Sequence, residues 1–147
     1  MNDIDFNKIQ KNWVLCQNDK CPKAGECLRH IACAQAPASV KKWECLLPNA
    51  INEAECKFFQ SAGKVTMARG LNSIYRDVDS RKVRSDIRLK LTTLFGSKGT
   101  YYRYKDGERT MNPQMQQQVA DIVHQYAPTA VVNFDETFED YDFSAIQ

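Results

Sequence analysis

The stretch "VRSDIRLKLTTLFGSKGTYYRYKDGER", residues 83–109, has the pattern of two helices joined by a glycine turn. Asp79 or Ser80 can cap the start of the first helix, and Gly96 can close its end. The second helix is shorter and ends before Gly107. The first helix carries apolar side chains at helical spacing: Val83, Ile87, Leu91, Leu94 and Phe95. The stretch therefore predicts a pair that is similar to a helix-turn-helix.

The second helix of this pair is rich in cations and tyrosines, which suits contact with nucleic acid. Basic side chains meet phosphates, and a recognition helix presents polar groups to base edges in the major groove. Tyrosines between cations also stack on single-stranded bases. We expect Tyr102 to anchor the helix in the core. The residues expected to contact nucleic acid are Lys98, Thr100, Tyr101, Arg103, Lys105 and Arg109.

The pair partly resembles the helix-turn-helix of bacterial regulators. It departs from that pattern at Thr92, where a smaller residue usually permits close packing, and at Lys105, where the residue is often apolar. Helical pairs with a glycine turn also occur in many proteins that do not bind DNA. A solvated cationic surface is therefore the alternative interpretation.

Two more helices are expected beside this pair. Residues 63–78 carry an apolar stripe at helical spacing, formed by Val65, Ala68, Leu71, Ile74 and Tyr75. In residues 112–128, Asn112 is the expected N-cap, Pro113 the first helical residue and Pro128 the terminator. Together these segments predict a basic helical region over residues 64–127.

The stretch "CQNDKCPKAGECLRHIAC", residues 16–33, holds four of the six cysteines and a histidine. A loop with Pro and Gly lets its first three cysteines converge on one point. A histidine three positions after the third cysteine lies on the same side of a helix. Cys33 is turned elsewhere, so the fourth ligand is expected to be the histidine or Cys56. The predicted metal ligands are Cys16, Cys21, Cys27, His30 and Cys56.

Zinc is the expected cofactor of this cysteine-rich region, residues 1–63. A tetrahedral thiolate site for zinc contributes folding free energy directly. The spacing C-x4-C-x5-C-x2-H resembles a loose CCCH zinc finger, a family that binds RNA, but places the histidine one residue early. An iron–sulfur cluster also uses four thiolates, and packed reduced cysteines are the remaining alternative.

The composition favours a small protein whose fold is stabilised by such a metal site. Leu, Ile, Val and Phe account for 32 of 147 residues, just above the range typical of disorder. A core this lean often depends on a metal, a disulfide or a partner. Neither a signal peptide nor a membrane-spanning run is evident, so a cytoplasmic protein with reduced thiols is expected.

Charged residues are distributed unevenly along the chain, although the net charge is only +2. Residues 64–109 hold twelve Lys and Arg against five Asp and Glu, whereas residues 110–147 hold six acids and no Lys or Arg. The first block predicts a basic binding face. The third region, residues 128–147, is expected to be an acidic aromatic tail that docks on the helices, with a short strand near residues 131–134.

Four motifs along the chain, in order, suggest a relationship: "CPKAGECLR", "CKFF", "LFGSKGTYYRYKDGERTMNPQMQQQVADI" and "FDETFEDYDF". With them the chain resembles, over nearly its full length, an uncharacterised bacterial family of cysteine-rich small proteins. The resemblance implies no activity. It implies only that the cysteine-rich and basic regions belong to one module.

The sequence thus predicts a mainly α fold in which a metal-stapled N-terminal subregion packs on a helix-turn-helix-like bundle, with at most one short strand pair. No phosphate loop or catalytic motif is present, so no catalytic residue is expected. The expected function is a non-enzymatic, cytoplasmic, nucleic-acid-binding module, in the manner of a transcription regulator. The alternatives are a protein-interaction adaptor and an iron–sulfur or thiol redox sensor. A protein partner is therefore also expected as an alternative, and no small-molecule substrate is.

Overall fold

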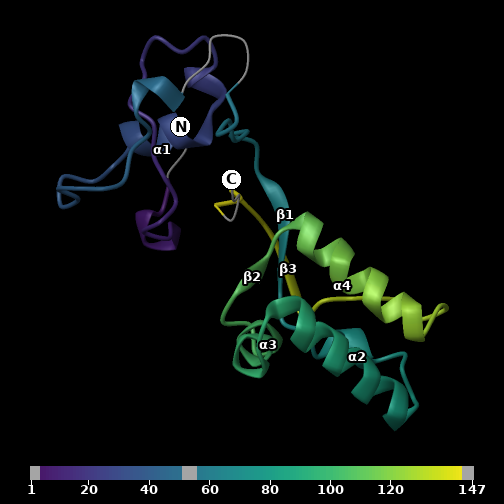
Figure 1. Cartoon of the computed structure of the whole chain (residues 1–147). Coiled ribbons are helices and arrows are strands. Elements are labelled where there is room, and N and C mark those ends of the chain that lie inside the picture. The colour runs from purple at the N-terminus through teal and green to yellow at the C-terminus, as the bar shows by residue number, and fades with distance from the viewer. Residues whose placement is uncertain (1–3, 51–55, 144–147) are drawn as a thin grey trace. The chain divides into compact units, whose positions relative to one another are not determined.

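The computed structural model describes residues 4–50 and 56–143, which fall into two compact units (Figure 1). The first unit comprises Met1–Gly63 and Tyr141–Gln147, and the second comprises Lys64–Asp140. Each unit has its own cluster of buried apolar side chains. The predicted tail, residues 128–147, is therefore shared between the two units.

In the residues that the structure describes, the first unit is mostly irregular chain around the short helix α1 (Leu28–Ala34). Three 3-10 turns accompany it: η1 (Phe6–Lys8), η2 (Ala24–Glu26) and η3 (Pro48–Ala50). Isolated β-bridges join Leu15 to Cys45 and Cys27 to Ser61. Scattered backbone hydrogen bonds, such as Leu28 N–H to the Gln60 carbonyl, and side-chain contacts together hold these segments.

One such side chain is Arg29, which lies on α1 and is 1% exposed. Its Nε donates to the carbonyl oxygen of Phe58 at 2.7 Å, and its Nη1 donates to that of Val14 at 2.7 Å. Its guanidinium also lies 4.6 Å from the ring centroid of Trp13. A single buried cation therefore connects α1 to two irregular segments.

Aromatic side chains from distant parts of the sequence complete this core. Phe6 packs edge-on against Trp43 at 5.1 Å, and Trp13 packs edge-on against Phe143 at 5.3 Å. Tyr141 is buried in the same cluster. The two aromatics after residue 140 are therefore part of the core of the first unit.

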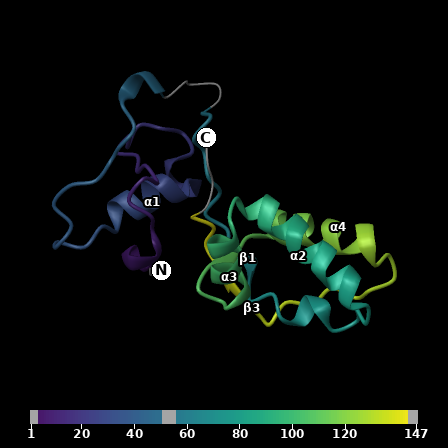
Figure 2. The same ribbon diagram turned by 60° about the horizontal axis from the view of Figure 1, so that its bottom comes forward.

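Helices and a sheet form the second unit (Figures 1 and 2). Its helices are α2 (Arg81–Phe95), α3 (Lys98–Lys105) and α4 (Pro113–Tyr126), with the 3-10 turn η4 (Ser73–Tyr75) before them. Its strands are β1 (Val65–Arg69), β2 (Thr110–Met111) and β3 (Glu136–Asp140). β1 is central and antiparallel to both neighbours, and α2 packs against α3 and α4.

The predicted ends of α2 and the predicted start of α4 are confirmed. Ser80 caps α2 by accepting a hydrogen bond from the Val83 N–H, and Gly96 ends it in the left-handed conformation with φ of 92°. Asn112 caps α4 by accepting from the Met115 N–H at 2.8 Å. Local capping chemistry alone determines these boundaries.

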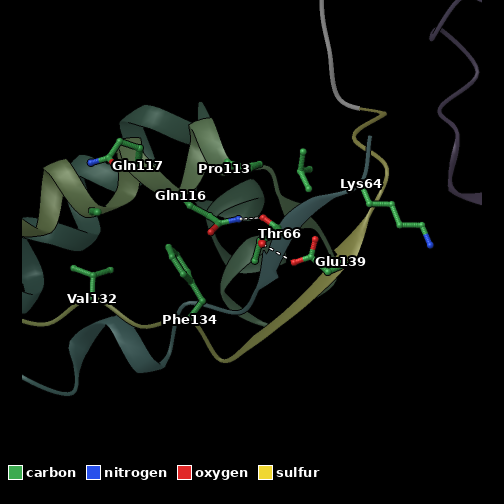
Figure 3. Close-up of a pocket in the computed structure, with 10 residues that line it drawn as sticks. Lys64, Thr66, Pro113, Gln116, Gln117, Val132, Phe134 and Glu139 are labelled. Carbon is green, nitrogen blue, oxygen red and sulfur yellow. Dashed lines mark hydrogen bonds between the residues drawn. The ribbon is translucent and has the colours of Figure 1, made fainter. Parts of the chain in front are cut away.

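A glutamine on α4 connects this helix to the sheet (Figure 3). Gln116 Nε2 donates to the carbonyl oxygens of Met111 and Thr66, each at 2.9 Å. β2 pairs only with residues 68 and 69 of β1, so the Thr66 carbonyl lies beyond the end of β2. Gln116 therefore provides a hydrogen bond that a longer β2 would have provided.

The predicted mainly α fold with at most one strand pair is wrong, because the described residues include a three-stranded sheet. The predicted helix over residues 63–78 is instead β1, a turn at Gly70 and η4. Its apolar stripe fits a helix, but β1 pairs over its whole length with Glu136–Asp140, far along the chain. Such a distant partner overrides the local pattern.

The turn after β1 is closed by Asp135. Its carboxylate accepts hydrogen bonds from the Ser73 N–H at 2.7 Å, the Asn72 N–H at 3.3 Å and Asn72 Nδ2 at 2.9 Å. Burial alone would raise the pKa of Asp135, but these hydrogen bonds together outweigh it and lower the pKa. Gly70 has φ of 85°, and a Cβ there would clash with the same carboxylate.

We expect Asp135→Ala to lower the free energy of unfolding at neutral pH by about 1 kcal/mol, because the turn loses its acceptor. The folded pKa lies below the unfolded one, so the stabilisation by this carboxylate is complete above the unfolded pKa. It is lost as the pH falls through the folded pKa. Urea denaturation followed by circular dichroism should therefore show a gap between wild type and variant that closes in acid. A gap independent of pH would contradict this account.

Candidate nucleic-acid interface and thiol pocket

The turn between α2 and α3 has a defined geometry. Gly96 donates its N–H to the carbonyl oxygens of Thr92 and Thr93, at 3.0 and 3.2 Å. Ser97 then caps α3, and its Oγ accepts from the Thr100 N–H at 3.1 Å. Thr100 also accepts a hydrogen bond from the Ser97 hydroxyl at 2.9 Å. Thr100, a predicted contact residue, is therefore engaged in the cap of α3.

Tyr101 anchors α3 to the rest of the second unit. It is 1% exposed and shares a core cluster with Ile87 and Leu91 of α2. Its hydroxyl lies 2.7 Å from the hydroxyl of Tyr75, and burial followed by this hydrogen bond raises its pKa. Tyr102 was predicted to be the anchor, but it is 37% exposed. The side chain of Tyr101 consequently lies inside, away from any ligand on the surface.

The other predicted contact residues differ in whether their side chains already have partners within the protein. Lys98 and Arg103 are exposed on α3. Lys105 Nζ donates to Asn72 Oδ1 at 2.8 Å, so it helps to hold the turn after β1. The Arg109 guanidinium lies 5.9 Å from the ring centroid of Tyr104. Lys98, Tyr102 and Arg103 are therefore the exposed groups of α3 that are best placed for a partner.

Positive charge extends from α3 onto α2. Residues 81–106 contain eight Lys and Arg against two Asp. Two of these cations have local partners: Arg84 donates to the carbonyl oxygens of Val78 and Tyr75, and Lys82 lies 3.4 Å from Asp86. Arg88 and Lys90 are exposed. This helical pair therefore carries a net positive charge on its solvent-facing side.

Acidic residues of the predicted tail contact the sheet. Glu136 of β3 lies 3.7 Å from Arg69 of β1, and Glu139 Oε1 accepts from the Thr66 hydroxyl at 2.6 Å. The predicted strand near residues 131–134 is displaced to β3, and the half-buried Phe134 packs against the core cluster. These carboxylates thus stabilise the pairing of β3 with β1.

Four cysteines of the first unit line one small cavity: Cys16, Cys21, Cys27 and Cys56. The cavity has a volume of about 30 Å³, which is the size of one water molecule or one ion. Arg29 also lines it, and Arg29 Nη2 is buried with no hydrogen-bond partner among the described residues. Burial is the main cause that raises the pKa of the Cys16 thiol.

His30 lines the same cavity, but its Nε2 lies 2.9 Å from Asp19 Oδ1. In residues 4–50 and 56–143, no group of three or more His, Cys, Asp or Glu has the arrangement of a metal-binding group. The predicted fold with a metal-stapled first region is therefore wrong. The packing around Trp13 and the hydrogen bonds of Arg29 hold this unit together instead.

The remaining two cysteines form a separate pair. Cys33 and Cys45 are half-buried and interact through their side chains, and burial followed by the charge of Cys45 raises the pKa of Cys33. Neither lines the cavity of about 30 Å³. The six cysteines of the chain therefore fall into one group of four and one pair.

A larger, open groove of about 520 Å³ lies on the second unit (Figure 3). Polar groups of Thr66, Gln116 and Glu139 face it, and Val132 and Phe134 form its apolar side. The hydrogen bonds of Gln116 and Glu139 to Thr66 occupy these polar groups.

The model of a family of unknown function, DUF6078, matches residues 1–143. The chain belongs to this family. Membership in DUF6078 confirms the predicted relationship to an uncharacterised family, and the match covers both units. No curated protein and no solved structure matches the chain.

DUF6078 is a family of unknown function, so membership in it supplies no activity. Within the parts of the chain that the structure describes, no helix combines the length and apolar character needed to cross a bilayer.

The burial of Tyr101 and the exposure of Tyr102 predict opposite responses to truncation. We expect Tyr101→Ala to lower the free energy of unfolding by about 3 kcal/mol or more, because it leaves a cavity and an unpaired Tyr75 hydroxyl. Tyr102→Ala, the matched control on the next residue, should change it by about 0.5 kcal/mol or less. Urea denaturation of both variants measures the difference. An equal loss of stability in the two variants would show that the assignment of Tyr101 as buried and Tyr102 as exposed is wrong.

Proposed function

We propose that the protein is a non-enzymatic module that binds nucleic acid through α2 and α3 and acts in transcription regulation. The observation that carries the proposal is the exposed face of α3. Lys98 and Arg103 supply positive charge there, and Tyr102 supplies an exposed aromatic ring on the same helix. Phosphates attract the cations, and bases stack on exposed rings.

The rigidity of this face supports the proposal. Tyr101 and the Gly96 turn fix the direction of α3 relative to α2. Phe95 of α2 stacks on Tyr104 of α3, with ring centroids 4.4 Å apart. A recognition element on a fixed scaffold loses little conformational entropy when it binds. Two helices joined by a short glycine-containing turn resemble a helix-turn-helix, although likeness of fold alone does not imply function.

On this proposal the protein acts in the cytoplasm, its partner is nucleic acid, and it has no small-molecule substrate. A second candidate is a protein-interaction adaptor. It is favoured by one observation, the 65% exposure of Leu89 on α2. A large apolar side chain that is mostly exposed on a basic helix also suits contact with a protein partner.

We expect the double variant Lys98→Glu with Arg103→Glu to lower affinity for DNA roughly tenfold or more, because two attractive charges become repulsive. Fluorescence anisotropy with a labelled duplex and a labelled single strand measures this. The affinity of the wild type should also fall steeply between about 50 and 200 mM salt. The variant should show a shallower salt dependence, since it makes fewer phosphate contacts.

The matched control is Lys41→Glu with Lys42→Glu, two exposed cations of the first unit that give the same change in net charge. If both double variants weaken binding equally, only overall charge matters and the assigned face is wrong. If the wild type binds neither strand form, the adaptor becomes the better interpretation.

A further inference from the structure

Arg29 is a buried cation with an incomplete set of partners. Two of its three nitrogens donate to carbonyl oxygens, but Nη2 has no partner among the described residues. No carboxylate in that part of the chain forms an ion pair with it. A charge withdrawn from water is costly unless an anion faces it. The cavity beside Arg29 is therefore the place where a negative group is missing.

The side chains around this cavity determine which negative group fits. Cys16, Cys21, Cys27 and Cys56 line it, and thiols are neutral unless they lose a proton. Four thiolates around one divalent cation have a net charge of −2. Such a set would supply the anion that Arg29 lacks, and Arg29 Nη2 would donate to a sulfur as an outer partner.

The size of the cavity limits the ligand to a single ion. About 30 Å³ accommodates one ion but no organic cofactor. Thiolates select soft or borderline metals such as Zn²⁺ over hard cations. His30 is engaged with Asp19, so the cysteines are the better donor set.

We propose that these four cysteines bind one thiophilic metal ion reversibly, with Zn²⁺ as the representative ion and Arg29 as the charge partner of the thiolates. The ion is a ligand of a unit that is already folded, and the fold does not depend on it. Binding draws the thiols together from positions that do not form a metal-binding group. Cys21 and Cys56 are half-buried in segments without regular secondary structure, while Cys16 and Cys27 are buried.

The test uses the full-length chain, reduced and freed of metal by a chelator. Zn²⁺ is titrated in competition with a chromophoric chelator, and Co²⁺ is added separately as a spectroscopic probe. We expect one Zn²⁺ per chain, together with the thiolate-to-cobalt charge-transfer bands of a tetrahedral site. Chelator treatment should leave the circular dichroism of the protein unchanged.

Two pairs of substitutions separate the ligands from the other cysteines. Cys27→Ser with Cys56→Ser should lower the affinity for Zn²⁺ more than about 100-fold. Cys33→Ser with Cys45→Ser, the matched control, should leave it within about twofold, because neither lines the cavity. His30→Ala should retain binding of one ion.

No binding by the wild type, or an equal loss in both serine pairs, would overturn the proposal. Loss of binding in His30→Ala would overturn the four-cysteine ligand set. Circular dichroism of each variant shows whether it is folded, and Co²⁺ spectra of the folded variants report the ligands directly. DNA binding by α2 and α3 is measured independently, so the failure of one proposal leaves the other intact.

Discussion

A buried guanidinium is the constraint on which the first unit depends. Among the described residues, Arg29 is the one charged side chain that is fully withdrawn from water. It can stay there only while the carbonyl groups of Val14 and Phe58 accept its hydrogen bonds and Trp13 covers its face. These requirements connect α1 to two segments that have almost no regular secondary structure. Nη2 has no partner among the described residues, and Arg29 lines the same cavity as four cysteines.

In the second unit, the sequence predicted those features that depend on neighbouring residues. Ser80, Gly96 and Asn112 cap their helices through groups within four positions, so their roles can be derived from the sequence. The sheet could not be derived in this way. β1 is a strand because Glu136–Asp140 pairs with it, and the apolar spacing of residues 65–75 gives no sign of that partner. Pairing between distant segments is determined by tertiary contacts.

The candidate sites show the same limit at the level of single residues. Sequence spacing located α3, but the choice between Tyr101 and Tyr102 as its anchor depends on where Tyr75 lies. The sequence offered Cys56 as an alternative to His30 for the fourth position beside three closely spaced cysteines, and all four cysteines line one cavity. Arg29 was not selected, because no local pattern distinguishes an arginine that will be buried. An arginine beside His30 in a short and mostly apolar helix was the signal available.

The order of the units along the chain has a consequence for synthesis. The second unit is continuous, Lys64–Asp140, whereas the first takes Tyr141 and Phe143 from the segment that follows it. A ribosome therefore delivers all of the second unit before it delivers the aromatics that complete the earlier one. The cysteine-rich segment is consequently made first but finishes its core last, and its thiols stay open to the surrounding redox chemistry in the interval.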